Sequence, residues 1–180
     1  MKKINAIAFD LGGVLIKEKD YPLSPEEEIL EKSFGNINNN EEYLDWAGKK
    51  TNFSKDKIKK VTEKIVENLY ELREPEIFNQ LPKMKLAIAS NHLSAIHKWI
   101  EKANIKSKFD CILISADINT EKPKKEFFQK LTTKLNEKKE NILFIDDSPK
   151  NIQEAKKFGL SVLLYTSSKS LTREINNYLK

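Results

Sequence analysis

Short apolar runs rich in β-branched residues alternate with helical patterns along most of the chain. Five runs are typical of strands buried on both faces, because they lack the polar alternation of a half-exposed strand. They are Ile4–Phe9, Leu86–Ala89, Phe109–Ile114, Ile142–Ile145 and Ser161–Tyr165. Amphipathic helical patterns follow them at Leu93–Ala103, Pro123–Leu135, Pro149–Phe158 and Leu171–Leu179. This alternation predicts an α/β fold with a doubly wound, five-stranded parallel sheet of the Rossmann-like kind.

Residues 16–77 interrupt the alternation. They hold three amphipathic helical stretches and no strand signal. The stretches are Pro25–Ser33, Glu41–Lys49 and Lys55–Leu72. We therefore predict a core domain made of residues 1–15 and 78–180, with a small α-helical cap at residues 16–77. An insertion directly after the first strand lies over the edge of the sheet where ligands bind in such folds.

The distribution of charge narrows the range of partners. The chain has a net charge of +5, from 32 Lys and Arg against 27 Asp and Glu. The lysines are interleaved with glutamates, and the chain has no basic block and no arginine cluster that would grip a nucleic-acid backbone. We therefore expect no nucleic-acid partner. A positive overall field would still attract a small anionic substrate.

The single cysteine and the apolar runs indicate the compartment. Cys111 lies in an apolar run, so we expect it in the core and predict neither a disulfide framework nor a cysteine metal site. No run reaches the length of a membrane span. Asp10 interrupts the first apolar stretch too early for a signal peptide. The sequence predicts a cytoplasmic protein with no membrane partner, and it leaves the oligomeric state open, with a monomer favoured.

Polar motifs follow the first two predicted strands. In the first motif, an apolar run ends at Asp10, which is followed by Leu11-Gly12-Gly13. The Asp10 carboxylate therefore lies at the rim of the sheet. There it could act as a nucleophile or a metal ligand, or it could simply cap the next turn or helix. In the second, Ser90-Asn91 places a hydroxyl and main-chain amides ahead of a helix. Such a pair forms an anion cradle, although Ser90 could equally be a helix N-cap.

Two further motifs bring charge to the same edge. Lys122, in Glu121-Lys122-Pro123, lies between the third and fourth strands and supplies a compact positive charge. Asp146 and Asp147 follow the fourth strand and precede a helix. A capping role accounts for only one of these two acids. Mg²⁺ accounts for both, since it takes few carboxylates together with waters.

In this order, each at the end of a strand, the four motifs resemble those of the haloacid dehalogenase-like (HAD) hydrolase superfamily, and the resemblance covers the whole chain. The first motif and the small helical insertion after it are similar to those of the small-cap phosphatases of that superfamily. The resemblance implies a Mg²⁺-dependent phosphohydrolase that acts on a small phosphorylated metabolite through an aspartyl-phosphate.

The same resemblance implies a role for each residue of the motifs. Asp10 would attack phosphorus. Mg²⁺ would be held by the carboxylates of Asp10 and Asp147 and by the main-chain carbonyl of Gly12, while Asp146 would orient metal-bound water. A second set would bind the phosphoryl oxygens: Ser90, the main-chain N–H of Asn91, and Lys122.

Gly12 departs from the pattern of the fully equipped phosphatases, which carry a second Asp at this position. That Asp contacts the metal through its main-chain carbonyl, so Gly12 can preserve the metal site. Its side chain serves as general acid and base, a contribution typically of about 10²–10⁴-fold in rate. Some phosphatases of the subfamily carry Gly here. His92 could supply the missing proton, although a His in a first helical turn is more often a cap or a surface residue.

Three interpretations follow. The first is the phosphohydrolase. The second is a relative that binds phosphate and metal without efficient turnover, because it lacks the second Asp. The third is a dehalogenase, which shares that loss but needs no metal. The pair Asp146-Asp147 argues against the third.

Overall fold

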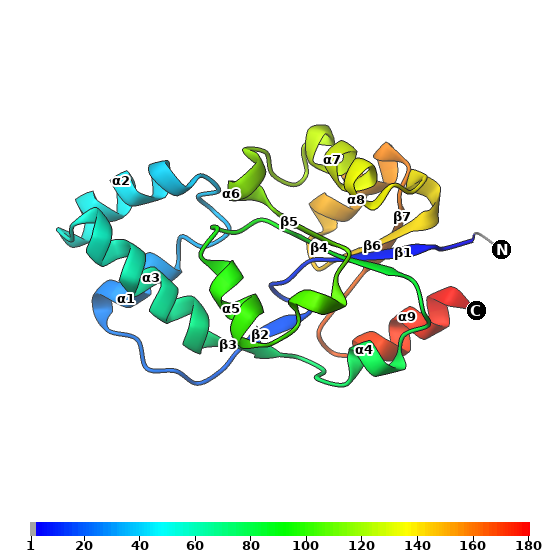
Figure 1. Cartoon of the computed structure of the whole chain (residues 1–180), viewed down its shortest axis with the longest axis horizontal. Helices are drawn as coiled ribbons and strands as arrows, with labels where there is room; N and C mark the ends of the chain where they lie inside the picture. Colours follow the sequence, from blue (N-terminus) through cyan, green and yellow to red (C-terminus); the bar gives the residue numbers. More distant parts are fainter. Residues whose placement is uncertain (1–2) are drawn as a thin grey trace.

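The five predicted strands form one parallel sheet in the computed structural model, which describes residues 3–180. The strands are β1 (Ala6–Phe9), β4 (Lys85–Ser90), β5 (Cys111–Ile114), β6 (Ile142–Asp146) and β7 (Ser161–Leu164), in the order β5-β4-β1-β6-β7 (Figure 1). Each neighbouring pair is parallel. Strands β4 and β5 lie on one side of the central strand β1, and β6 and β7 lie on the other. The carboxyl ends of β1, β4 and β6 therefore meet where the strand order reverses, which is where ligands bind in such sheets. The predicted fold is confirmed.

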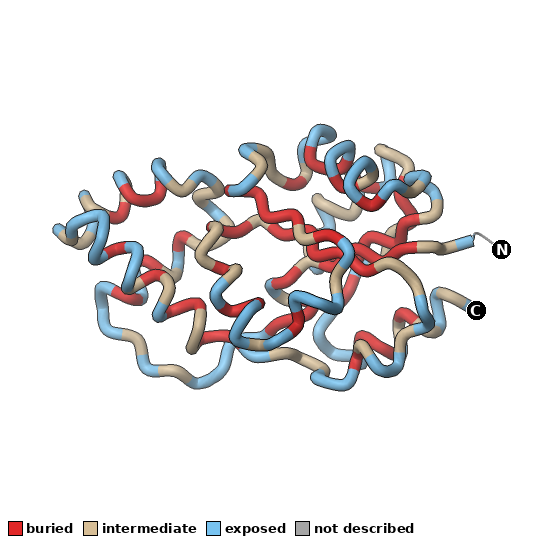
Figure 2. The backbone as a smooth tube through the Cα atoms, in the orientation of Figure 1, coloured by how far each residue is buried: buried red, intermediate tan, exposed pale blue. Residues whose placement is uncertain are grey.

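Alternation of side-chain size along β1 sets the two layers of helices. Ala6 and Ala8 face one side of the sheet, where the phenylalanines of α7 (Lys125–Leu135) fill the space above the small side chains. Ile7 and Phe9 face the other side, which is covered by α5 (Ile96–Lys102) and α9 (Leu171–Leu179). Helix α8 (Pro149–Phe158) lies with α7 on the first side (Figure 1). Figure 2 shows the buried residues concentrated in the strands between these layers.

Short elements complete this part of the chain. They are the helices α4 (Ile77–Gln80) and α6 (Ser115–Ile118) and the 3₁₀ turns Lys106–Lys108 and Lys139–Asn141. Helix α8 spans the range predicted for it. Ser148 is its N-cap, Pro149 lies in the first turn, and Gly159 adopts the left-handed conformation after the last residue. Cys111 is buried, as expected. Within the described residues, no helix combines the length and the apolar character that crossing a membrane requires.

Residues 16–77 form three helices and one small sheet. The helices are α1 (Pro25–Glu31), α2 (Asn40–Thr51) and α3 (Lys55–Leu69), which lie together at the left of Figure 1. Their N-caps are the side chains of Ser24, Asn39 and Ser54. The division of the chain into core and cap remains a prediction.

The expectation that residues 16–77 hold no strand is wrong. β2 (Ile16–Glu18) precedes the three helices in the sequence and β3 (Tyr70–Leu72) follows them, and the two strands pair antiparallel. The predicted helix Lys55–Leu72 therefore ends earlier, at Leu69. Strands of three residues are too short to show a period of two, and their partners lie far apart in the sequence, so no local pattern predicts them.

Candidate functional site

A buried lysine joins two of the predicted acidic residues. The Lys122 Nζ atom lies 2.8 Å from Oδ2 of Asp10 and 2.6 Å from Oδ2 of Asp146. Lys122 is 3% exposed and Asp146 is fully buried. Burial alone would lower the pKa of Lys122, but the two carboxylates outweigh it and raise that pKa above its ordinary value. Lys122 therefore carries a positive charge at neutral pH, at the carboxyl ends of β1 and β6.

The second motif contacts both charged groups. Ser90, at the end of β4, donates a hydrogen bond from Oγ to Oδ1 of Asp10 at 2.7 Å. The Asn91 side chain holds the main chain of Lys122, since its Nδ2 donates to the Lys122 carbonyl at 3.0 Å and its Oδ1 accepts from the Lys122 N–H at 2.8 Å. The structure thus brings Asp10, Ser90, Asn91 and Lys122 together. Asn91 positions the lysine through its side chain, which the sequence did not indicate.

Asp146 is fully occupied by contacts within the protein. Besides Lys122, it accepts hydrogen bonds from the Ser148 N–H at 2.8 Å and from Nδ2 of Asn151, which lies 3.0 and 3.1 Å from its two oxygens. Asn151 was not predicted, because an Asn in the first turns of a helix carries no signal for such a contact. Asp146 is therefore held rigidly by the start of α8.

Asp147 completes a cluster of three carboxylates. Asp10, Asp146 and Asp147 each offer an oxygen that lies within 4.8 Å of the others. Burial, followed by the charge of Asp146, raises the pKa of Asp147. Such a cluster is stabilised by a bound cation, because the positive charge offsets both the repulsion and the loss of solvation.

Glycine is required where the loop after β1 passes Asp147. Gly13 has a φ of +71°, and a Cβ placed on it would lie 2.1 Å from Oδ2 of Asp147. Arg73 fixes this loop by donating hydrogen bonds to the carbonyls of Gly13 and Val14 at 3.3 and 3.2 Å. Gly12 differs, since a Cβ on it would meet nothing within 4 Å. The space for a side chain at position 12 is therefore open.

A cavity of about 230 Å³ opens above Asp10 and Ser90. Its lining comes from both parts of the chain: Asp10, Gly12, Ile16, Glu18, Glu31, Phe34, Gly35, Tyr70, Ser90, Asn91 and His92. Gly35 approaches the main chain of the second motif, since a Cβ on it would lie 3.5 Å from the Asn91 carbonyl. The turn after α1 thus encloses the predicted site. Lining residues such as Glu18 and Glu31 carry no sequence signal that separates them from the other surface charges.

His92 lies in the wall of this cavity and not on the surface, where sequence statistics would put it. It is 6% exposed, and its Nδ1 lies 3.2 Å from the Leu93 carbonyl. Burial lowers its pKa to about 4. At neutral pH the imidazole is uncharged, so it has no extra proton to give to a leaving group.

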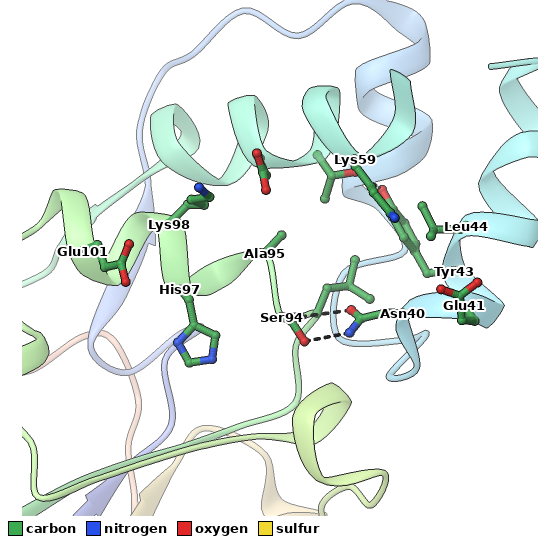
Figure 3. A pocket seen from close by; sticks show the side chains of 13 residues that line it. Asn40, Glu41, Tyr43, Leu44, Lys59, Ser94, Ala95, His97, Lys98 and Glu101 are labelled. Carbon is green, nitrogen blue, oxygen red and sulfur yellow. Dashed lines mark hydrogen bonds between the residues drawn. The ribbon is translucent and has the colours of Figure 1, made fainter. Parts of the chain in front are cut away.

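A larger cavity of about 550 Å³ lies away from these residues, between α2, α3 and α5 (Figure 3). None of the predicted site residues lines it. At one end, Asn40 and Ser94 exchange hydrogen bonds of 2.7 and 3.2 Å, drawn as dashed lines in Figure 3. Among the described residues, the acids that line this cavity form no group close enough to hold a metal ion.

Solved structures with the same fold include enzymes of two chemistries. A HAD family enzyme from Bacteroides thetaiotaomicron, in complex with magnesium and inorganic phosphate, superposes with a TM-score of 0.69 at 21% identity and covers 93% of this chain and 96% of its own. A predicted phosphoglycolate phosphatase from Haemophilus somnus gives 0.65 at 19%, with 97% and 92% covered. L-2-haloacid dehalogenase from Xanthobacter autotrophicus gives 0.67 at 17%, with 89% and 76% covered. At these identities the likeness shows the fold alone.

A family model gives the relationship itself. No curated protein matches the chain by sequence. The model described as haloacid dehalogenase-like hydrolase matches residues 17–165, which include the second, third and fourth motifs. The matched stretch begins after Asp10. In the structure, Asp10 contacts Ser90 and Lys122, which both lie within the matched stretch. The chain belongs to the haloacid dehalogenase-like hydrolase family.

Proposed function

We propose that this protein is a Mg²⁺-dependent phosphohydrolase that releases phosphate from a small phosphorylated metabolite through an aspartyl-phosphate on Asp10. The observation that carries the proposal is the ion-paired group at the floor of the cavity. There Asp10 faces the cavity while Ser90 and Lys122 contact its two oxygens. A carboxylate between a hydroxyl and an ammonium is placed to attack phosphorus while the two donors bind phosphoryl oxygens.

The residues present suit a magnesium ion. Three carboxylates within 4.8 Å of one another supply hard oxygen ligands. Asp10, Asp147 and the Gly12 carbonyl would bind the ion. Asp146, which already accepts hydrogen bonds from protein donors, would orient water bound to the ion. When bound, Mg²⁺ would place positive charge beside the phosphoryl oxygens and so stabilise the charge that develops in transfer.

The first step exchanges one bond to phosphorus for another. An oxygen of Asp10 forms the new bond to phosphorus while the ester bond breaks, and the departing oxygen takes its proton from water, because Gly12 supplies no acid. Lys122 stays charged and holds the phosphoryl group close to Asp10. Water then cleaves the acyl phosphate, which restores the Asp10 carboxylate and releases inorganic phosphate.

The dehalogenase interpretation explains less of the site. Displacement of a halide by Asp10 requires no cation, and it gives no role to Asp147, whose pKa is raised by burial and by Asp146. The phosphatase uses every charged group of the cluster.

Asp10→Asn should abolish turnover of p-nitrophenyl phosphate in the presence of Mg²⁺, because an amide cannot form the phosphoryl intermediate. The fold should persist, because the Asn side chain still offers an oxygen to the Ser90 hydroxyl and Lys122 retains its ion pair with Asp146. Steady-state assays and circular dichroism check both points. Mass spectrometry of acid-quenched wild-type protein should detect one added phosphoryl group that the variant lacks. Wild-type activity in a folded variant would rule out Asp10 as the nucleophile.

Asp147→Asn should weaken Mg²⁺ binding more than Asp146→Asn, because Asp147 has an open carboxylate whereas Asp146 is saturated by protein donors. Isothermal titration with Mg²⁺ measures this. Asn is preferred to Ala at position 146, since truncation would leave Lys122 with one partner fewer in a buried site. The exposed Asp20→Asn serves as a charge-matched control and should bind as the wild type does. Equal Mg²⁺ affinity in all four proteins would contradict the metal assignment.

Gly12 should make turnover depend on the leaving group. With no acid at this position, aryl and acyl phosphates should be hydrolysed readily and alkyl phosphates poorly. Gly12→Asp should raise alkyl phosphatase activity, by at most about 10²–10⁴-fold, since the space around position 12 is open. Gly12→Asn, equal in size but without an acid, is the control and should give no gain. A wild type that cleaves both ester classes equally, with chemistry rate-limiting, would show that another group protonates the leaving oxygen.

A further inference from the structure

The outer part of the cavity carries two carboxylates that the proposed chemistry does not use. Glu18, at the end of β2, and Glu31, at the end of α1, line the same cavity as Asp10. Burial, followed by the charge of Glu18, raises the pKa of Glu31, so the two groups interact. They come from the segment between β1 and β4, where the leaving group of a substrate bound at Asp10 would lie.

Neither carboxylate has an ion-pair partner within residues 3–180. Two of the lysines next to them in sequence pair with other residues, Lys17 with Glu71 at 3.0 Å and Lys32 with Glu28 at 3.5 Å. No Lys or Arg is among the described residues that line the cavity. The fold therefore leaves two negative charges facing a space that must admit an anionic phosphoryl group.

A buried hydrogen-bond acceptor lies in the same wall. Nδ1 of His92 faces the Leu93 carbonyl, so in the neutral ring Nδ1 carries the proton and Nε2 is the acceptor. Within the described part of the chain, Nε2 is the buried side-chain polar atom that has no hydrogen-bond partner. Leaving such a buried atom without a hydrogen bond is energetically unfavourable. A donor on a ligand would remove that cost.

Two aromatic rings pack near His92 in the cavity lining. The His92 ring centroid lies 5.3 Å from that of Phe34 and 6.1 Å from that of Tyr70. Phe34 and Tyr70 line the cavity beside Glu31. Carboxylates together with aromatic faces are suited to an ammonium group, which both attract electrostatically. A carboxylate or a second phosphate on the ligand would be repelled there.

We propose that the substrate is a phosphomonoester whose alcohol part carries an ammonium group, with the phosphoryl group at Asp10 and the ammonium between Glu18, Glu31 and Nε2 of His92. This inference rests on the proposed function, since it assumes that phosphate binds at Asp10. It assigns Glu18 and Glu31 to substrate specificity and not to the chemical step.

Non-hydrolysable phosphonates test the inference by binding alone. We would titrate the protein with 2-aminoethylphosphonate, propylphosphonate and 3-phosphonopropionate in saturating Mg²⁺, and follow the heat. A pH is chosen at which all three phosphonates are dianions and the amine is protonated. The wild type should bind the amine about tenfold more tightly than propylphosphonate, as expected for an energy of about 1.4 kcal/mol, and should bind the carboxylate most weakly.

The variants identify the groups responsible. Glu31→Gln and Glu18→Gln should each reduce the preference for the amine, and the double variant should bring it to within about twofold, because the attraction depends on charge. Glu26→Gln, on the exposed side of the same helix, should keep the full preference. All variants should keep the affinity for propylphosphonate.

Two results would overturn the inference, and they are distinguishable. Equal binding of the amine and propylphosphonate by the wild type, or a preference unchanged in the double variant, would reject the ammonium site and leave the phosphohydrolase proposal intact. Absence of binding for every phosphonate, together with no hydrolysis of p-nitrophenyl phosphate, would reject the phosphohydrolase proposal and this inference with it.

Discussion

The arrangement of the site depends on one buried cation. Lys122 holds Asp10 and Asp146 at 2.8 and 2.6 Å, and so connects the ends of two neighbouring strands, β1 and β6. Its main chain is held in turn by the Asn91 side chain after β4. Loss of one partner from a buried pair of this kind costs about 3–5 kcal/mol, since a charge remains without solvent or counterion. The ion pairs therefore maintain both the local fold and the position of the carboxylate that faces the cavity.

The sequence predicts the sheet and the floor of the site well, because both follow from burial. Continuous apolar runs must lie inside, and the polar residues at their carboxyl ends must meet at one edge of a parallel sheet. Asp10, Ser90 and Asp146 could be placed at that edge without coordinates. Lys122 was harder, since lysines are abundant in this chain, and only its place between the third and fourth strands indicated its role.

The part of the cavity lining that comes from residues 16–77, here called the roof, could not be predicted in the same way. The pairing of β2 with β3 joins segments from opposite ends of the insertion, and three residues give no readable period. Glu18 and Glu31 resemble solvated charges in a chain that is 33% charged. Asn151 resembles any helical Asn until its side chain is seen against both oxygens of Asp146. The positions of these residues at the cavity follow from contacts between distant segments, which local sequence patterns do not encode.

Charge balance links the floor of the cavity to its roof. Three carboxylates and one lysine leave two excess negative charges at the floor, so a dianionic phosphoryl group would be repelled there unless a divalent cation were bound first. Glu18 and Glu31 add negative charge to the lining of the same cavity. A ligand that is negative at one end and positive at the other would suit both groups at once. The net charge of +5 attracts anions in general and does not favour such a ligand over other anions. Nearby charges act more strongly on a ligand than distant charges screened by water and salt. The proposed ammonium site therefore assigns selectivity to the acidic residues that line the cavity and not to the overall excess of lysine.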